Sequence, residues 1–240
     1  MEDSIVTTKN NHYSLSIRFS SDGFSLLIFD ELKILLTTKK IPVELNSISY
    51  EEIINLLLED VETILNIKNV RLIYESNHYA FVPASIFKVE NAADFLFFHD
   101  KLNKNDSICY NKIPGWDIVS VFAVPKALLE ALTHLFPRLE LEHHLSWFLT
   151  EKIKLNDESC IQIWLRPKIM DIVVMNKGNI QMINSYDYQT TEDFTYFTLN
   201  IFQQLALNKE EYKVKLYNSG NCPELKLQLQ KFLKSVSCEQ

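Results

Sequence analysis

Glycine is scarce in this chain, and that scarcity bears on every fold whose loops bind phosphates. Only 4 of the 240 residues are glycine. Phosphate-binding loops depend on glycine because the missing side chain lets backbone N–H groups approach the phosphate oxygens. No P-loop string occurs, and neither G-x-S-x-G nor H-E-x-x-H is present. The common sequence signatures of nucleotide, serine and zinc hydrolases are therefore missing.

A net positive charge, long apolar runs and cysteine motifs are missing as well. The net charge is −7 and the pI about 5.4, so no nucleic-acid partner is expected. No run approaches the ~18 apolar residues of a membrane span, and the polar start MEDSIVTTKNNH is unlike a signal peptide. Without a C-x-x-C pair or a histidine at ligand spacing, the cysteines predict free thiols, a cytoplasmic protein and no metal site. The four cysteines are Cys109, Cys160, Cys222 and Cys238.

What the chain does contain is an internal repeat. SLSIRFSSDGFSLLIFDELKILL near the start and CIQIWLRPKIMDIVVMNKGNIQMI in the second half each read as three consecutive strands. A displacement of 146 positions, from 17 to 163, places Ile17 on Ile163 and Ile34 on Ile180 without a gap. The pattern predicts a duplicated three-strand unit.

A helix and a further strand follow each copy. SYEEIINLLLEDVETIL begins with a capping box at Ser49 and Glu52, and TTEDFTYFTLNIFQQLAL has Thr190 and Asp193 at cap spacing. The strands NVRLIYESN and YKVKLYNSGN come next. A closing helix is predicted from Pro223, with an apolar face that continues as far as 236.

The segment between the copies predicts a subdomain inserted at about 76–124. It contains an extended stretch broken at Pro83, a short helix NAADFLFFHDKL, and the strands SICYNKI and DIVSVFAV. The polar run 154–159 is the expected boundary, which gives a first lobe over 1–154 and a second over 155–240.

Two copies of a three-strand, helix, strand unit resemble the actin-like ATPase superfamily. The middle region, IYESNHYAFVPASIFKVENAADFLFFHDKL and VSVFAVPKALLEALTHLFPRLELEHHLSWFL, is similar to the actin-like proteins of type IV pilus assembly and type II secretion. Within that superfamily the chain resembles an uncharacterised bacterial family with a degenerate form of the fold. The resemblance implies an α/β protein with mixed sheets, a duplicated ribonuclease H-like fold, and two lobes around a cleft.

Members that hydrolyse ATP hold it with two phosphate loops, one in each copy, and a third loop near the nucleoside. The first loop corresponds here to Ser20, Ser21, Asp22 and Gly23, and Arg18 or Ser20 occupies the position of the family's metal-binding carboxylate. Aspartate followed by glycine is itself a hairpin-turn signal, so we favour a simple turn over a residual anion site.

The second and third loops depart further from that pattern. Trp164 falls at the acidic position and Arg166 at the glycine, while Pro167 has no N–H to donate. Arg166 and Lys168 are expected to be solvated surface charges, with phosphate binding as the alternative. The third loop, NSGNCPEL, keeps Ser219 and Gly220 but only one glycine of the usual pair. No cofactor is therefore expected.

Three expectations about individual side chains follow. Asp22 is predicted to approach Arg166 or Lys168 and occupy the space of a nucleotide. Asp171 has no evident partner. His143 and His144 are expected to form a cap or surface pair, because neighbours on a helix point about 100° apart.

The predicted function is that of a catalytically inactive protein that binds another protein or peptide. By resemblance, the partner is the cytoplasmic tail of a membrane protein. The binding surface is then expected at Phe95, Phe97 and Phe98, although core packing between subdomains is the more ordinary role for these side chains. The alternatives left open are a divergent nucleotide-binding ATPase or kinase, and a structural subunit of a homodimer.

Overall fold

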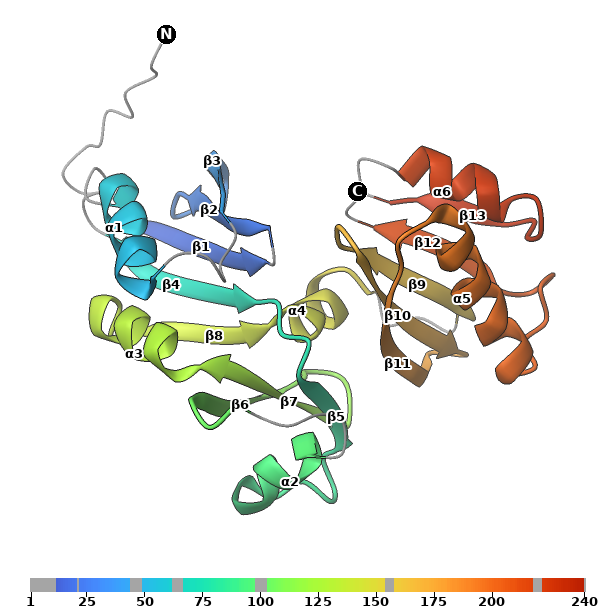
Figure 1. Ribbon diagram of the computed structural model, residues 1–240, viewed down its shortest axis with the longest axis horizontal. Coiled ribbons are helices and arrows are strands. Elements are labelled where there is room, and N and C mark those ends of the chain that lie inside the picture. Colours follow the sequence, from blue (N-terminus) through green and yellow to red (C-terminus); the bar gives the residue numbers. More distant parts are fainter. Residues whose placement is uncertain are drawn as a thin grey trace, which may run out of the picture. The chain divides into compact units, whose positions relative to one another are not determined.

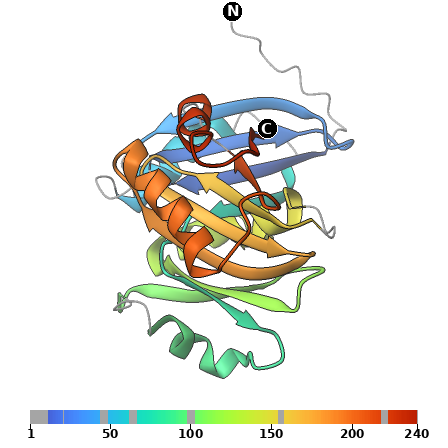
Figure 2. The same ribbon diagram turned by 90° about the vertical axis from the view of Figure 1, so that its right-hand side faces the viewer.

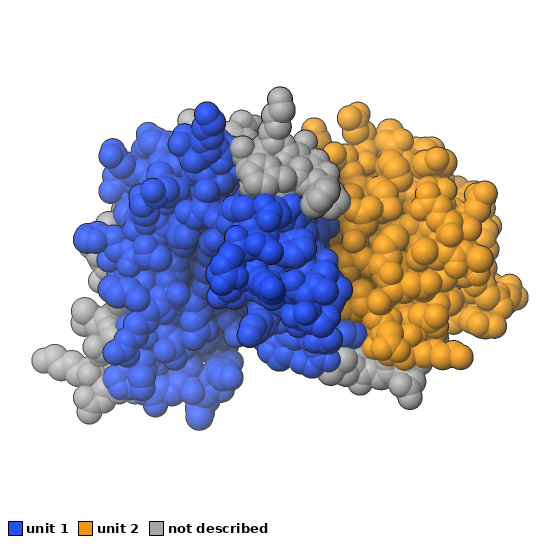
Figure 3. Space-filling model, turned by 90° about the horizontal axis from the view of Figure 1, so that it is seen from below, with its two compact units in different colours: residues 1–152 blue, residues 153–240 orange. Residues whose placement is uncertain are grey.

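A computed structural model describes most of the chain. The described residues are 12–20, 22–43, 49–61, 67–97, 103–153, 158–217 and 222–239, except the side chains of 58–61 and 97. The chain forms two compact units, Met1–Lys152 and Ile153–Gln240, which Figure 3 distinguishes by colour.

The sheet of the first unit contains five strands in the order β3-β2-β1-β4-β8 (Figure 1). They are β1 (Tyr13–Ser20), β2 (Gly23–Phe29), β3 (Leu35–Pro42), β4 (Ile67–Tyr74) and β8 (Leu139–His143). The first three pair antiparallel, and β4 and β8 extend the sheet in parallel. Apolar and polar residues alternate along β1, so every second side chain is buried on one face.

Two helices cover that apolar face. Ile53 and Leu57 of α1 (Tyr50–Val61) join a buried cluster with Leu128 and Leu132 of α3 (Lys126–Leu135) and the inward side chains of β1 and β2. The capping box of α1 is confirmed, since the Glu52 N–H donates to Ser49 Oγ at 3.2 Å. A further helix, α4 (His144–Glu151), follows β8 directly.

The segment between β4 and α3 forms a separate small sheet with the strand order β5-β7-β6. Its elements are β5 (Tyr79–Pro83), η1 (Val89–Asn91), α2 (Ala92–Phe97), β6 (Asp106–Lys112) and β7 (Ile118–Pro125). Leu96 of α2 packs with Val82, Val119 and Val121 in a core of its own. This insertion is what distinguishes the first unit from the second.

The second unit repeats the five-stranded order as β11-β10-β9-β12-β13. The strands are β9 (Cys160–Leu165), β10 (Ile169–Asn176), β11 (Asn179–Asp187), β12 (Lys213–Tyr217) and β13 (Val236–Cys238). Figure 2 shows α5 (Thr191–Gln204) and α6 (Cys222–Leu229) in front of this sheet. The predicted capping box of α5 is present, because the Asp193 N–H donates to Thr190 Oγ1 at 3.1 Å.

The closing helix is shorter than the sequence pattern predicted. It ends at Leu229, Phe232 is 51% exposed, and Val236 belongs to the edge strand β13. As a strand, these last residues form backbone hydrogen bonds with β12. Apolar periodicity along the sequence does not detect such pairing with a distant strand.

The duplication is confirmed at the level of strand register. Ile17 pairs with Leu26 in the first sheet, and Ile163 pairs with Ile172, each 146 positions later, in the second. The third strand corrects the gapless alignment: Phe29 pairs with Leu35, whereas Met175 pairs with Ile180. Leu35, not Ile34, therefore corresponds to Ile180, because the first copy has one more residue in the connection.

The prediction that all four cysteines are free is wrong. Cys222 and Cys238 form a disulfide with a Cα–Cα distance of 6.1 Å, while Cys109 and Cys160 are free. The two bonded residues lie 16 apart in sequence, and only the return of the chain from α6 into β13 brings them together. Among the described residues, no helix is both long and apolar enough to cross a membrane.

Candidate functional site

The β1–β2 turn, where the first phosphate loop was expected, is closed by its own side chains. Ser20 Oγ donates to Asp22 Oδ1 at 2.7 Å, and Lys40 Nζ on β3 donates to Asp22 Oδ2 at 2.9 Å. The hydrogen bond from Lys40 lowers the pKa of the Asp22 carboxyl below its ordinary value. Asp22 thus has a cationic partner within its own unit, in agreement with a simple turn. Ser21 lies outside the described residues.

Gly23 meets a packing requirement in this turn. Its φ is 130°, and a Cβ atom there would lie 2.2 Å from the Ile41 carbonyl oxygen of β3. The missing side chain therefore admits the neighbouring backbone of β3. This observation accounts for the glycine without any ligand.

Arg166 is the main correction to the predicted site. It is not a solvated charge: its side chain is 2% exposed, and that of Asp171 is 0% exposed. Arg166 Nε donates to Asp171 Oδ2 and Nη2 donates to Asp171 Oδ1, both at 2.8 Å. Ser185 Oγ also donates to this carboxylate. Asp171, expected to have no partner, holds Arg166 in the bidentate geometry that suits guanidinium and carboxylate.

The backbone of the β9–β10 turn is also engaged. The Arg166 N–H donates to the Ile169 carbonyl at 2.8 Å, and the Tyr188 N–H donates to the Lys168 carbonyl at 2.9 Å. The Tyr188 hydroxyl donates to the Arg166 carbonyl at 3.2 Å. Pro167 and Lys168 are exposed. These hydrogen bonds join the β9–β10 turn to β10 and to Tyr188, the residue after β11. In a phosphate loop, the backbone amides at this position are free to bind phosphate.

The prediction that Asp22 approaches Arg166 or Lys168 joins residues of two separate units and stays a prediction. Asp22 binds Lys40 and Arg166 binds Asp171, so each charge is satisfied within its own unit. Trp164 lies directly opposite Asp171 in the β9–β10 register. The third loop, with Ser219 and Gly220, falls outside the described residues.

A cation occupies the position that matches Trp164 in the first unit. Arg18 lies 4.4 Å from the centre of the Trp147 ring of α4, in cation–π geometry. Burial lowers the pKa of the Arg18 guanidinium, and the charge of Glu75 opposes that effect. By resemblance, ATP-hydrolysing members of the actin-like superfamily have a metal-binding carboxylate at the end of this strand. The Arg18 guanidinium would instead repel a divalent cation.

Of the predicted cap or surface pair of histidines, His143 is the N-cap residue of α4, although its side chain makes no cap hydrogen bond. His143 is 0% exposed and His144 is 2% exposed, so neither is a surface residue. His143 ends β8 and His144 begins α4, and their ring centres lie 4.4 Å apart. The Nδ1 atom of His143 lies 3.4 Å from Ser120 Oγ, and its backbone N–H donates to Asn111 Oδ1 at 2.8 Å. These contacts join the small sheet to β8.

The phenylalanines proposed for partner binding divide between two situations. Phe95 is half-buried against the core of the inserted subdomain, with its ring centre 6.3 Å from that of Phe87. Phe97 is described only in its backbone, and Phe98 lies outside the described residues. Phe95 therefore packs within the inserted subdomain, not between subdomains.

Exposed apolar side chains nevertheless gather in that subdomain. Ile86 is 59% exposed, Val89 55% and Tyr110 41%, and the Tyr110 ring centre lies 5.2 Å from that of Phe87. We call Ile86, Phe87, Val89 and Tyr110 the insert patch. Sequence reasoning missed it because alternation within short strands does not show which face a later helix covers.

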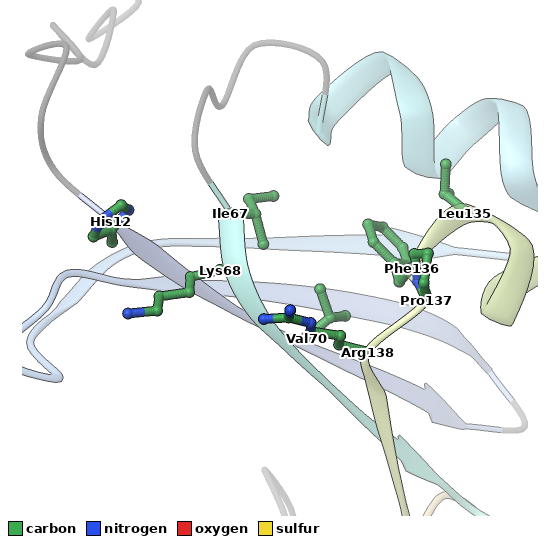
Figure 4. A pocket seen from close by; sticks show the side chains of 8 residues that line it. All are labelled: His12, Ile67, Lys68, Val70, Leu135, Phe136, Pro137 and Arg138. Atoms are coloured by element: carbon green, nitrogen blue, oxygen red, sulfur yellow. The ribbon is translucent and has the colours of Figure 1, made fainter.

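A cavity of about 520 Å³ opens at the amino-terminal edge of the first sheet (Figure 4). Ile67, Val70, Leu135 and Phe136 are among its apolar lining residues. The side chains of Lys68 and Arg138 extend in roughly the same direction from the lining, and His12 also lines the cavity. α3 ends at Leu135, and cations near a helix carboxyl end are favoured by the helix dipole. The charges therefore have a structural explanation, and the cavity identifies no ligand.

Known structures share this fold. A Bacteroides thetaiotaomicron protein with an actin-like ATPase fold and unknown function matches with a TM-score of 0.83 and 23% identity, over 100% of this chain and 94% of its own. A PilM–PilN type IV pilus biogenesis complex matches with a TM-score of 0.52 and 10% identity, over 95% and 88%. The ethanolamine utilization protein EutJ from Carboxydothermus hydrogenoformans gives 0.50 and 13%, over 94% and 84%.

These likenesses confirm the expected mixed α/β, two-lobed fold of the actin-like ATPases. No curated protein matches the chain. The family comparison gives a match over residues 2–236. By that match, the chain belongs to the family described as protein of unknown function DUF3822.

Proposed function

We propose that this protein is a catalytically inactive member of the actin-like fold that works by binding another protein. The observation that carries the proposal is the buried bidentate pair of Arg166 and Asp171 in the β9–β10 turn. In ATP-hydrolysing relatives, by resemblance, this turn holds phosphates through free backbone amides. Here the Arg166 side chain is buried, and Asp171 neutralises its charge.

Energetics support this proposal. An ATP phosphate bound at Arg166 in place of Asp171 would break a buried ion pair, and removing one partner of such a pair costs about 3–5 kcal/mol. It would also leave the Asp171 carboxylate close to the negative phosphate. In the first unit, Arg18 provides positive charge where a metal ion would need oxygen ligands.

The partner is proposed to be a protein or peptide, such as the cytoplasmic tail of a membrane protein. One of the structural relatives is a complex of PilM with PilN. The insert patch is the surface we assign to this role, because its Phe87 ring lies between the exposed Tyr110 at 5.2 Å and the half-buried Phe95 at 6.3 Å. Exposed apolar groups that gather on one small subdomain are typical of protein-binding surfaces. The free-thiol argument for the cytoplasm no longer applies, since two cysteines are bonded.

Thermal unfolding with Mg-ATP distinguishes this proposal from a divergent ATPase or kinase. A nucleotide at 100 times its dissociation constant would stabilise the protein by about 2.7 kcal/mol. We expect an unchanged melting temperature up to millimolar Mg-ATP and no phosphate release. A saturable shift that requires both magnesium and nucleotide would refute catalytic inactivity and favour the enzyme.

Substitutions in the insert patch test the binding role. Ile86→Ser and Tyr110→Ala are expected to abolish capture of the partner that the wild-type protein retains from its source cells. Leu227→Ser removes a side chain that is 66% exposed on α6, and serves as the matched control. Equal capture by all four proteins would refute the assignment of the surface.

A further inference from the structure

A disulfide helps to hold the outer strand of the second sheet in place. β13 pairs with β12 through three residues, which begin at Val236 and end at Cys238. Two backbone hydrogen bonds flank these pairs, from the Val214 N–H to the Ser235 carbonyl and from the Glu239 N–H to the Leu216 carbonyl. Of the side chains of β13, only that of Val236 is buried. The disulfide adds a covalent link from Cys238 to Cys222, the first residue of α6.

The first unit holds the equivalent strand without a covalent bond. β8 occupies the same position in the strand order, next to β4, as β13 does next to β12. β8 pairs with β4 through five residues, from Leu139 to His143, and neither strand contains a cysteine. The architecture therefore does not require a disulfide at this edge. The shorter ladder of β13 is the one that a disulfide reinforces.

The core of the second unit depends little on β13. Its buried cluster contains side chains from β9, β10, β12, α5 and α6, whereas β13 contributes Val236 alone. Leu233, which precedes β13, is 3% exposed and packs in the same cluster. Release of β13 would therefore remove one apolar side chain and leave the rest of the core in place. Such local opening does not require the unit to unfold.

The two bonded cysteines differ in their access to a reductant. Cys238 is exposed, whereas Cys222 is 6% exposed within the core cluster. A thiolate of an incoming dithiol attacks the Cys238 sulfur and forms a mixed disulfide, while Cys222 leaves as a thiolate and takes up a proton. The second thiolate of the dithiol then displaces Cys238 as a thiol, and the dithiol is oxidised to a disulfide. The other two cysteines compete poorly, because burial raises the pKa of Cys109 to about 11 and also raises that of Cys160.

We propose that Cys222 and Cys238 form a reversible thiol–disulfide switch that controls whether β13 stays paired with β12. In the oxidised form, β13 is the edge strand of the second sheet. Reduction by a dithiol leaves β13 with its short ladder and one buried side chain, so the strand detaches and the outer edge of β12 opens to solvent. An open strand edge has unpaired N–H and C=O groups that can pair with another strand. This inference is independent of the insert patch and of nucleotide binding.

Hydrogen exchange of the full chain, followed by NMR, tests the switch. The reporters are the amides of β13 and the Val214 N–H, which donates to the Ser235 carbonyl at 2.9 Å. Dithiothreitol is expected to raise their exchange about 100-fold relative to the amides that pair β9 with β10. Oxidation with diamide is expected to restore slow exchange. If β13 and β9 remain equally protected after reduction, the disulfide only stabilises the unit as a whole, and the proposal is overturned.

Two variants separate the switch from a general effect of the reducing agent. Cys238→Ser lacks the disulfide and is expected to show fast exchange of β13 with or without dithiothreitol. Cys109→Ser is the matched control, since it removes a free cysteine and is expected to switch as the wild type does. Equal protection of β13 and β9 in Cys238→Ser would contradict the proposal. So would a wild-type disulfide that dithiothreitol reduces only after a denaturant is added.

Discussion

Asp171→Asn is the substitution that most directly tests how the β9–β10 turn is held. Asparagine keeps the size of the side chain but removes the charge that neutralises Arg166. The pair is almost completely shielded, with exposures of 2% and 0%, and has two hydrogen bonds of 2.8 Å. Removal of one partner of a buried ion pair leaves an uncompensated charge and costs about 3–5 kcal/mol.

A second variant separates the pair from the packing. Replacing both partners, as Arg166→Met with Asp171→Leu, removes the charge and its counter-charge together. Such replacements are often neutral or stabilising. Ser185 loses an acceptor in this variant, so we expect a loss of about 1 kcal/mol. The single substitution, which changes fewer atoms, is therefore expected to destabilise the protein more than the double one.

Native-state hydrogen exchange is the appropriate measurement, because the two compact units need not unfold together. Peptides that cover β9, β10 and β11 report the free energy of opening in the second unit. Peptides from β1 and β2 are the internal control and are expected to exchange as in the wild type. A loss below about 1 kcal/mol for Asp171→Asn would refute the claim that the pair is buried and holds the turn.

Three further predictions concern stability. Hydrogen bonding to Lys215 lowers the Glu158 pKa below its ordinary 4.5, so the carboxylate stabilises the fold above that pH and this contribution disappears as the pH falls through the lowered pKa. Glu158→Gln should cost ~0.5–1 kcal/mol in urea unfolding near pH 7 and progressively less as the pH falls below 4.5. A loss that does not decrease with falling pH would contradict the sign. Gly23→Ala should lower the free energy of unfolding by about 2 kcal/mol or more, because the alanine Cβ would clash with the backbone of β3. An unchanged melting temperature would show that the turn relaxes to accommodate the new side chain. Cys238→Ser removes the disulfide that closes a loop with a sequence separation of 16, and should lower the free energy of unfolding by about 3 kcal/mol. Cys160→Ser is the control. Reducing agent should lower the melting temperature of the wild type but not of Cys238→Ser.

Local patterning explains why so much of the fold was predictable. β1 alternates buried and partly buried residues along its whole length, and α5 begins at a capping box that four adjacent residues define. These signals depend on neighbours in sequence, and they occur twice in the same order. The repeat therefore predicted two sheets of the same topology without knowledge of any contact between distant residues.

The candidate site was less predictable because its contacts cross between strands. The sequence showed that the second loop has no glycine, but it gave no sign that Arg166 is buried, and we predicted a solvent-exposed charge. Arg166 and Asp171 lie five residues apart, on opposite sides of a turn whose geometry decides whether the two side chains meet. The same is true of Arg18 and Trp147, which only the packing of α4 brings within 4.4 Å.

The sequence by itself determined the repeated strand order, the helix starts and the lack of a glycine in the second loop, because each follows from residues close together along the chain. Only the tertiary structure decided which charges are buried in pairs and which cysteines are bonded. Those properties depend on the register between strands, and a shift of a single residue in the β2–β3 connection is enough to change which side chains are equivalent.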